Sequence, residues 1–528
     1  MKICIIGSPG SGKTLLSNVL WRLLNDSFAL FHGDDYFQEN EDRINQLNSD
    51  LGNSEDWIYE HPLAFKHCSR LNREVDFLIA VAPSRLLLRQ RLVSRGGFTN
   101  EMASEDDFDR LDDLLSEQIT SARNRGVRVL QGNGFQDLLP AIISAIWGDR
   151  VLRTKVDMIV PKVSSYCNLN CSYCYMFKSF DDVWQQKPPF ISVDTAKVLG
   201  QRINEYISNA THRRGKPFIV IYHGGEPLLL GKDKFIEVTE AILSGLVGCS
   251  TQVKFGVQTN GTLISNETLQ ALDNYGFSVG VSIDGTTEMS NKERQTKAGG
   301  SALDAIISGI NMAKRFPWRK GCFAGCLSVV NPDFDGNTSY KEMCEVSPSG
   351  FDFLLLDHNW DNPPIKSVAP FLKAAFNEWL NDSQSRPVRI FQTLIGKLLG
   401  GRSGSDAFGI EHATTVFLDV EGNYESHNVL RVAYKGAWQL PYNIKHHSIE
   451  GVTNSPEMLK WWLHHYKYDN KCISCRYFFV CGGGYLPHRY STEKEFQNPS
   501  IYCDDIIDFL KYAESMVGDI VNASSLKR

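Results

Sequence analysis

The run Cys167-Asn168-Leu169-Asn170-Cys171-Ser172-Tyr173-Cys174 carries the most specific signal in this sequence of 528 residues. Its thiols, in the spacing Cys-x3-Cys-x2-Cys, can ligate three irons of one 4Fe-4S cluster and leave the fourth iron open. A zinc site usually takes a fourth ligand at a similarly tight spacing, and three unrelated thiols rarely lie this close together. We therefore predict a 4Fe-4S cluster on Cys167, Cys171 and Cys174.

The sequence contains six strand-like segments around and after the cysteine run. The first of them ends just before this run. Stretches with 3.6-residue apolar spacing, which is typical of amphipathic helices, separate most of them. Repeated βα units with short connections predict a parallel barrel, complete or partial, over residues 151–365. The expected strands are 156–163, 218–223, 253–258, 277–282, 322–330 and 351–356, and the expected helices are 193–207, 234–246, 267–275 and 302–316.

The cysteine run, with Tyr173 before its last cysteine, resembles the signature of the radical S-adenosylmethionine (SAM) enzymes. The resemblance implies a partial (βα)6 barrel with SAM bound at the open iron. It also implies that an electron enters the sulfonium of SAM and yields a 5′-deoxyadenosyl radical, which abstracts hydrogen from the substrate. The electron is expected from a low-potential donor such as flavodoxin or ferredoxin.

Further motifs lie at the ends of the expected strands, where barrel enzymes place their chemistry. The segment Gly224-Gly225-Glu226-Pro227 resembles the family's GGEP segment, whose backbone and acidic residue receive the SAM amino group. The segments that begin at Gln258 and at Ser282 resemble the next two motifs of the anaerobic sulfatase-maturase branch. In that pattern Ser282 and Arg294 help to hold the ribose and carboxylate of SAM. The resemblance thus implies a cofactor site of Tyr173, Gly224, Gly225, Glu226, Pro227, Gln258, Ser282 and Arg294.

Four later cysteines, Cys472, Cys475, Cys481 and Cys503, are enough to close the coordination shell of a second cluster or of zinc. Because this segment follows the expected barrel in the chain, it resembles the SPASM extension of peptide-modifying radical SAM enzymes. That extension normally holds two auxiliary clusters. Ligands that match the first auxiliary cluster are missing, because Tyr485 and His427 stand at cysteine positions. We therefore predict one auxiliary 4Fe-4S cluster. Asn428 replaces the aspartate that acts as a base in sulfatase maturases, which argues against that activity.

The N-terminal segment Gly7-Ser8-Pro9-Gly10-Ser11-Gly12-Lys13-Thr14 is a Walker A loop between an expected strand, 2–6, and an expected helix. Its backbone N–H groups would cradle phosphates, Lys13 would reach the β and γ phosphates, and Thr14 would help to bind Mg²⁺. Alternating strands and helices over residues 1–150 predict a doubly wound α/β P-loop domain that binds ATP. The expected nucleotide ligands are Gly7, Gly10, Gly12, Lys13 and Thr14.

The segments Asp34-Asp35-Tyr36-Phe37 and 57–65 resemble acceptor-side segments of uridine and nicotinamide riboside kinases. The resemblance implies that Asp34 is the catalytic base and that Asp35 binds Mg²⁺ through water. Lys13 of the phosphate site is the second expected catalytic residue. Glu60 replaces the aspartate that usually precedes the His-Pro pair. Arg89, Arg91 and Arg95 resemble lid arginines, although a solvated basic helix face has the same pattern.

The composition excludes some classes of protein. With 55 basic and 61 acidic residues, the net charge of −6 gives no general attraction to nucleic acid. No apolar run is long enough to span a membrane, and residues 3–6 are too short for a signal-peptide core, so we expect a cytoplasmic protein. Thirteen cysteines then need a use other than disulfides. Seven are predicted ligands, while Cys4, Cys322 and Cys326 fall in expected strands and should be buried thiols.

The chain should therefore contain a P-loop domain, a barrel, a helical linker over 366–410 and a SPASM-like domain over 411–528. Three functions remain open from the sequence. The barrel modifies a peptide or protein, or both parts act in turn on a nucleoside-like or sugar-like molecule, or the P-loop domain is only a nucleotide-dependent switch or binding module.

Overall fold

The computed structural model describes residues 1–7, 11–24, 28–32, 41–61, 64, 67–68, 73–83, 88, 105–146, 156–209, 216–401, 403, 405–410 and 415–525. The chain forms two compact units, Met1–Arg153 with Trp462–Lys467, and Thr154–Trp461 with Tyr468–Arg528. Some predicted site residues lie outside the described residues, namely Gly10, Asp34, Asp35, Arg89, Arg91 and Arg95.

The first unit is built on a parallel five-stranded sheet in the order β2-β3-β1-β4-β5. The side chains of β1 and β4 are almost completely buried, because these apolar strands occupy the middle of the sheet. The strand Trp57–Glu60 was not among the expected strands. The elements are β1 (Lys2–Gly7), α1 (Lys13–Leu23), β2 (Ala29–His32), α2 (Glu41–Gly52), β3 (Trp57–Glu60), β4 (Phe77–Val81), α5 (Glu105–Asn124), β5 (Arg128–Gly132) and α6 (Phe135–Ile146).

The second unit contains a nine-stranded sheet in the order β11-β10-β9-β8-β7-β6-β12-β13-β14. Its first six strands are parallel and follow one another in the sheet as in the chain. All six barrel strands expected from the sequence are present, each within two residues of its expected bounds. They are β6 (Met158–Ser164), β7 (Phe218–Gly224), β8 (Val253–Thr259), β9 (Phe277–Ser282), β10 (Cys322–Val329) and β11 (Phe351–Leu354).

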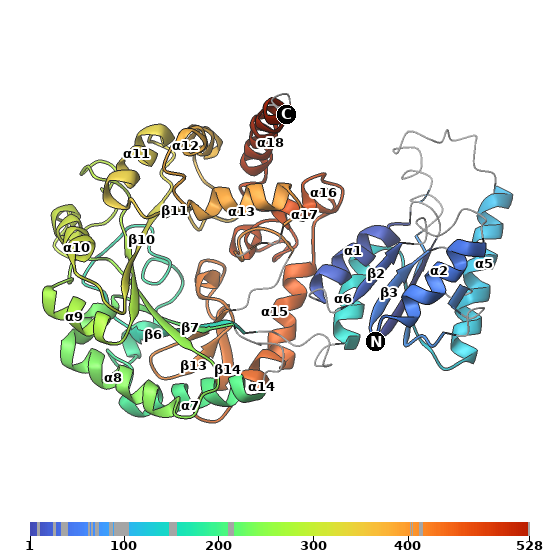
Figure 1. Ribbon diagram of the computed structural model, residues 1–528, viewed down its shortest axis with the longest axis horizontal. Coiled ribbons are helices and arrows are strands. Elements are labelled where there is room, and N and C mark those ends of the chain that lie inside the picture. Colours follow the sequence, from blue (N-terminus) through green and yellow to red (C-terminus); the bar gives the residue numbers. More distant parts are fainter. Residues whose placement is uncertain are drawn as a thin grey trace. The chain divides into compact units, whose positions relative to one another are not determined.

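Helices cover the outer side of this curved sheet (Figure 1). Tyr222 of β7 donates to or accepts from Thr239 of α8 at 3.1 Å, which fixes the outer face of the strand. Helices α7 and α8 pack very closely, because a Cβ on Gly200 would lie 2.1 Å from the carbonyl oxygen of Ile242. The helices are α7 (Val193–Asn209), α8 (Gly231–Gly245), α9 (Asn266–Asn274), α10 (Leu303–Arg315) and α11 (Gly336–Val346).

The extension continues the barrel sheet on the side of its first strand. Strand β12 pairs in parallel with β6, and β13 and β14 follow as antiparallel strands. The segment expected as a helical linker is helical and packs on the last helix, since Phe376 and Phe391 both contact Phe509. The elements are α12 (Ala369–Asn381), α13 (Arg389–Leu398), β12 (Thr415–Leu418), β13 (Asn423–Glu425), β14 (Gln439–Asn443), α14 (Ile449–Thr453), α15 (Pro456–Tyr466), α16 (Asn470–Ile473), α17 (Phe478–Cys481) and α18 (Cys503–Ser525).

Cys4 and Cys326 are buried as predicted, but Cys322 is exposed. It begins β10, at the end of the barrel opposite the cysteine run, where the strand emerges from a loop. In the described part of the chain, every helix is too short or too polar to cross a bilayer.

Candidate functional site

The cysteine run lies in the loop that follows β6, at the C-terminal end of the strand. The sulfur of Cys167 accepts a hydrogen bond from the N–H of Leu169 at 3.4 Å and lies 3.7 Å from Nδ2 of Asn260. Burial raises the pKa of Cys167 to about 12 and that of Cys171 to about 11, and the neighbouring thiols add to the effect. Because metal ligands must be thiolates, a bound cation is needed to keep these groups ionised.

The spacing of the thiols bears on the kind of metal centre. Among the residues that the structure describes, no three His, Cys, Asp or Glu side chains lie close enough together to share a single metal ion. Sulfur ligands of zinc sit about 2.3 Å from the metal and therefore crowd together. Cys167, Cys171 and Cys174 are close enough for the neighbouring thiols to raise the pKa values of Cys167 and Cys171. A 4Fe-4S cluster on these three thiols stays the prediction that their spacing in the sequence makes.

Arg294 is buried beside the cysteine run and is held by Asp284. Its Nε and Nη2 donate to the Asp284 carboxylate at 3.0 and 3.3 Å. The hydroxyl of Tyr173 donates to the same carboxylate at 2.5 Å, and the Arg294 guanidinium lies 5.5 Å from the centre of the Tyr173 ring. Burial raises the pKa of Cys171, and the charge of Arg294 opposes that increase. Asp284 thus fixes the Arg294 guanidinium beside Cys171, and its carboxylate offsets part of the positive charge there.

The segment Gly224–Pro227 approaches the cysteine loop so closely that side chains are excluded. A Cβ on Gly225 would lie 2.0 Å from the carbonyl oxygen of Tyr166. Glu226 is fully buried, and its carboxylate accepts hydrogen bonds from the N–H groups of Leu228 and Asn260 and from the hydroxyl of Thr259, at 2.6–2.9 Å. Burial raises the pKa of Glu226, and these bonds oppose the rise. In this structure Glu226 fixes the loop, while its predicted contact with the SAM amino group stays a prediction.

Residues 162–328 match the family model of the Radical SAM superfamily. This part of the chain is a radical SAM domain. The chain is 25% identical over 380 residues to the cysteine-type anaerobic sulfatase-maturating enzyme of Clostridium perfringens, covering 70% of this chain and 98% of that protein. It is 23% identical over 363 residues to the serine-type enzyme of Bacteroides thetaiotaomicron, covering 63% of this chain and 83% of that protein.

The solved structure of native anSMEcpe with bound AdoMet and Cp18Cys peptide has the same fold, with a TM-score of 0.59. The two chains are 22% identical, and the match covers 69% of this chain and 99% of that one. The chain therefore contains a radical SAM domain and has homologues among the anaerobic sulfatase-maturating enzymes, and the radical SAM match does not include its first 161 residues.

Polar side chains line the inner face of the radical SAM domain across four strands. Lys162 and His223 are neighbours in the parallel register of β6 and β7, on the face opposite Tyr222. On the next two strands, Nε2 of Gln258 donates to the hydroxyl of Ser282 at 2.9 Å. Burial lowers the pKa of His223 to about 4, and the charge of Lys162 adds to the effect. Within the described part of the chain, the buried Nδ1 of His223 has no hydrogen-bond partner.

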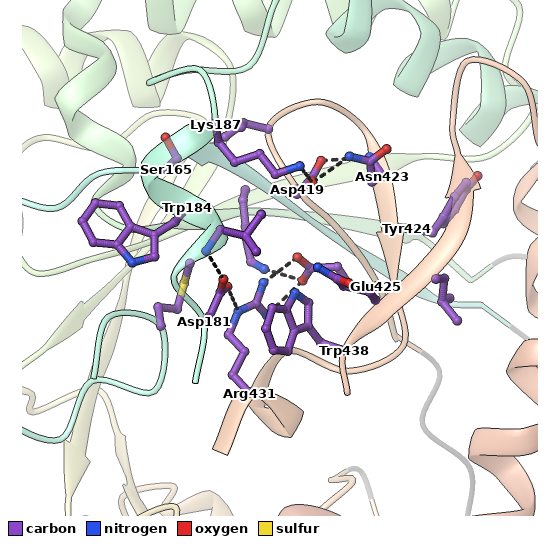
Figure 2. Close-up of a pocket in the computed structure, with 16 residues that line it drawn as sticks. Ser165, Asp181, Trp184, Lys187, Asp419, Asn423, Tyr424, Glu425, Arg431 and Trp438 are labelled. Carbon is purple, nitrogen blue, oxygen red and sulfur yellow. Dashed lines mark hydrogen bonds and ion pairs between the residues drawn. The ribbon is translucent and has the colours of Figure 1, made fainter. Parts of the chain in front are cut away.

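A cavity of about 200 Å³ lies between the radical SAM domain and the extension (Figure 2). Its lining comes from the end of β6, from the segment after the cysteine run, and from β13, β14 and the segments that flank them. The lining residues are Lys162, Ser165, Met176, Asp181, Val183, Trp184, Lys187, Asp419, Val420, Asn423, Tyr424, Glu425, Arg431, Trp438, Gln439 and Leu440.

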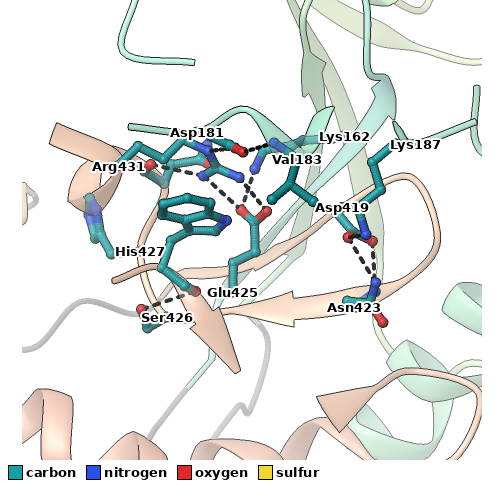
Figure 3. A network of polar contacts seen from close by, with 12 residues as sticks. Lys162, Asp181, Val183, Lys187, Asp419, Asn423, Glu425, Ser426, His427 and Arg431 are labelled. Atoms are coloured by element: carbon teal, nitrogen blue, oxygen red, sulfur yellow. Dashed lines mark hydrogen bonds and ion pairs between the residues drawn. The ribbon is translucent and has the colours of Figure 1, made fainter. Parts of the chain in front are cut away.

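The most deeply buried polar group of this cavity is an alternating series of charges (Figure 3). Glu425 forms an ion pair with Lys162 and accepts two bonds from Arg431, at 2.6 and 3.2 Å. Arg431 also donates to Asp181 at 2.6 Å and lies over the ring of Trp438 at 4.6 Å. Burial alone would raise the pKa of Glu425, but Arg431 and Lys162 outweigh it and lower the pKa to about 2. The series joins the barrel to the extension.

The four late cysteines come from α16, the turn after it, α17 and the start of α18. Burial raises the pKa of Cys472 to about 11, and Cys503 and Cys475 add to the effect. Burial also raises the pKa of Cys481, and the other three thiols add to this increase. Four mutually interacting thiols can hold a 4Fe-4S cluster or zinc, and the auxiliary cluster stays a prediction.

The two residues found at missing cysteine positions contact each other. The rings of His427 and Tyr485 meet edge to face with 5.4 Å between centres, and the Tyr485 hydroxyl lies 3.4 Å from Nε2 of His427. Asp406 bonds the same Nε2 at 2.8 Å, and Nδ1 accepts from the N–H of Val429 at 3.3 Å. Asn428 is buried next to this group. The place where the sequence predicts no cluster is thus filled by a hydrogen-bonded polar group.

In the first unit, Glu60 meets the residues at the start of α1. Its carboxylate lies 3.6 Å from Nζ of Lys13 and accepts from the Thr14 hydroxyl at 3.2 Å and from His32 at 3.0 Å. Burial raises the pKa of Glu60, but His32 and Lys13 lower it more, so that the pKa lies below its ordinary value. Gly12 has φ of +96°, a conformation that L side chains rarely adopt.

Sequence reasoning did not assign a role to several of these residues. Asp284 lies inside the motif that begins at Ser282. Arg294 was already assigned to the SAM site, and its need for an acidic partner could have pointed to Asp284. Lys162 stands in an expected buried strand, where a charged residue already indicates a buried partner. Glu425 is 263 positions away from Lys162, and no local pattern connects the two.

Proposed function

We propose that this chain is a radical SAM enzyme that modifies a side chain of a peptide or protein. The proposal rests on one observation above all: Cys171 and Cys174 of the matched domain lie near a guanidinium that Asp284 holds. The relatives support the substrate class, because the Clostridium perfringens protein is named a sulfatase-maturating enzyme and the anSMEcpe structure holds AdoMet and a peptide.

Each residue of the proposed site has a distinct task. Cys167, Cys171 and Cys174 would hold the iron, and Arg294 would bind the carboxylate of SAM. When bound, SAM and the cluster supply a 5′-deoxyadenosyl radical, with the electron from a donor such as flavodoxin or ferredoxin. On the inner face of the barrel, Gln258 donates to Ser282 and Lys162 pairs with Glu425, so these side chains are held in place.

Anaerobic reconstitution tests this proposal. We expect about eight iron atoms per chain, four in each of two clusters, and release of 5′-deoxyadenosine from SAM with dithionite. Cys174→Ala should lose about half of the iron and all SAM cleavage, whereas Cys481→Ala should lose a similar amount of iron and retain cleavage. Iron near four in the unchanged protein would refute the second cluster, and SAM cleavage by the Cys174 variant would refute the assigned site.

We do not propose sulfatase maturation for this chain. Asn428 stands where the relatives' pattern has a basic aspartate, and an uncharged amide does not take up a proton at ordinary pH. His427, which replaces a cysteine, has both ring nitrogens in hydrogen bonds. A substrate radical formed in this chain would therefore have neither the aspartate base nor the cysteine ligand of that pattern beside it.

For the first unit we propose ATP and Mg²⁺ binding at Lys13 and Thr14. The position of Glu60 supports it, because a carboxylate next to a lysine and a threonine hydroxyl is suited to orient Mg²⁺ and its water ligands. Kinase activity towards a nucleoside-like or sugar-like molecule is the second candidate, and a nucleotide-dependent switch is the third. Lys13→Ala should abolish ATP turnover and leave SAM cleavage intact. ATP turnover by this variant would refute the site, and ADP formation that depends on an added nucleoside would favour the kinase over the switch.

A further inference from the structure

The cavity next to the cysteine run has room for one large side chain. Its volume of about 200 Å³ is below the roughly 300–1,000 Å³ of sites that bind drug-sized ligands, which favours a guest of side-chain size over a whole SAM molecule or a nucleotide. Ser165 lies two residues before Cys167, and Met176 lies two residues after Cys174. A side chain in the cavity is therefore adjacent to the loop that carries the predicted cluster.

The charges of the lining cancel within the lining. Three lining residues are basic and three are acidic, and each has an opposite partner among the same residues. Glu425 already accepts three bonds and Asp181 is held by Arg431 (Figure 3). A charged side chain that entered the cavity would lose its hydration. The opposite charges in the lining are already paired with one another, so burial of this side chain would be unfavourable. The ion pairs are Lys162–Glu425, Arg431–Glu425, Arg431–Asp181 and Lys187–Asp419.

The remaining lining offers mostly apolar surface. Trp184 stands apart from the charged series in Figure 2, with its ring edge-on to Phe177. Val183 belongs to the short helical turn Val183–Gln186 in the segment that follows the cysteine run. Apolar atoms in such a wall favour a guest that leaves water on binding. The other apolar and aromatic lining residues are Met176, Val420, Tyr424, Trp438 and Leu440, and the uncharged polar ones are Ser165, Asn423 and Gln439.

We propose that this cavity binds an uncharged apolar or aromatic side chain of the peptide substrate and so positions the peptide at the radical SAM site. The inference rests on the proposed function, since it assumes a peptide substrate. It adds a selection rule: the residue that enters the cavity carries no charge.

Binding of single-residue probes to the anaerobically reconstituted full chain tests this rule. The probes are the N-acetyl amides of phenylalanine, leucine, lysine and glutamate, with Kd measured by ligand-observed NMR. The phenylalanine and leucine amides should bind at least tenfold more tightly than the lysine and glutamate amides. Val183→Trp should weaken the neutral probes at least tenfold by filling the cavity, and the milder Leu440→Phe should weaken them in the same direction. Leu399→Trp adds the same ring at a position that is 69% exposed and should change nothing.

The outcomes separate this inference from the proposed function. Equal or tighter binding of the charged amides overturns it, and so does binding of the neutral amides that survives Val183→Trp. A lack of binding by every amide also overturns it. Release of 5′-deoxyadenosine is measured on the same samples. Selective binding without SAM cleavage would support the proposed role of the cavity and refute the proposed function. SAM cleavage without selective binding would support the proposed function and refute the role of the cavity.

Discussion

Removing the charge of Glu425 should destabilise the second unit strongly. In Glu425→Gln, Arg431 keeps its charge, and Lys162, whose pKa burial and Arg431 lower to about 8, loses the carboxylate that raises its pKa. Both side chains are at most 4% exposed. Breaking one partner out of a buried ion pair costs about 3–5 kcal/mol. The pKa leads to a similar figure: lowering a carboxyl pKa from 4.5 to about 2 corresponds to about 3 kcal/mol of stabilisation of the ionised form.

Urea-induced unfolding followed by tryptophan fluorescence measures this loss, because Trp438 stacks on Arg431. We expect the free energy of unfolding of the variant to fall by about 3 kcal/mol at pH 7. Glu421→Gln is the matched control, since Glu421 is 43% exposed and its partner Lys187 keeps Asp419. Its effect should stay below about 1 kcal/mol.

The pH dependence gives a second check with a defined sign. A carboxyl group whose pKa is lowered by folding contributes stability above its unfolded pKa, and this contribution is lost as the pH falls toward the folded value. The difference between the two proteins should therefore be full above pH 4.5 and shrink between pH 4.5 and about 2. A loss below 1 kcal/mol at pH 7, or a difference that stays constant through this window, would refute the assigned role of Glu425.

Two further changes test the group around Arg294. Asp284→Asn leaves the guanidinium without its carboxylate, and loss of such an orienting partner typically costs about 10–100-fold, so Kd for SAM measured by equilibrium dialysis should rise by that factor with iron content unchanged. Tyr173→Phe removes one hydrogen bond to Asp284, worth about 1 kcal/mol, and should raise the same Kd only about fivefold. An unchanged Kd in both variants would show that Arg294 does not depend on this group.

The barrel could be predicted from the sequence because its signals are local. Each strand is a short apolar run followed by a turn and an amphipathic helix, and this pattern is written into consecutive residues. The cysteine run is equally local, since its ligands lie within eight positions. Such features depend little on distant parts of the chain.

What the sequence did not predict depends on distant residues or on very short elements. Strand β3 has only four residues, and Trp57–Glu60 owes its strand geometry to pairing with both β1 and β2. The ion pair of Lys162 with Glu425 depends on β12 joining the sheet beside β6. A single sequence contains no spacing that reports this pairing.

The contact of His427 with Tyr485 links two sequence departures that are 58 positions apart. Ligands of one cluster converge on one place, so residues that replace two of them should meet there, and these two rings do. Filling that place with a ring pair and with Asp406 avoids the cavity that lost iron and sulfur atoms would leave, and cavities are costly. Cys472, Cys475, Cys481 and Cys503 influence one another in the same extension, which supports the proposal that they hold the auxiliary cluster.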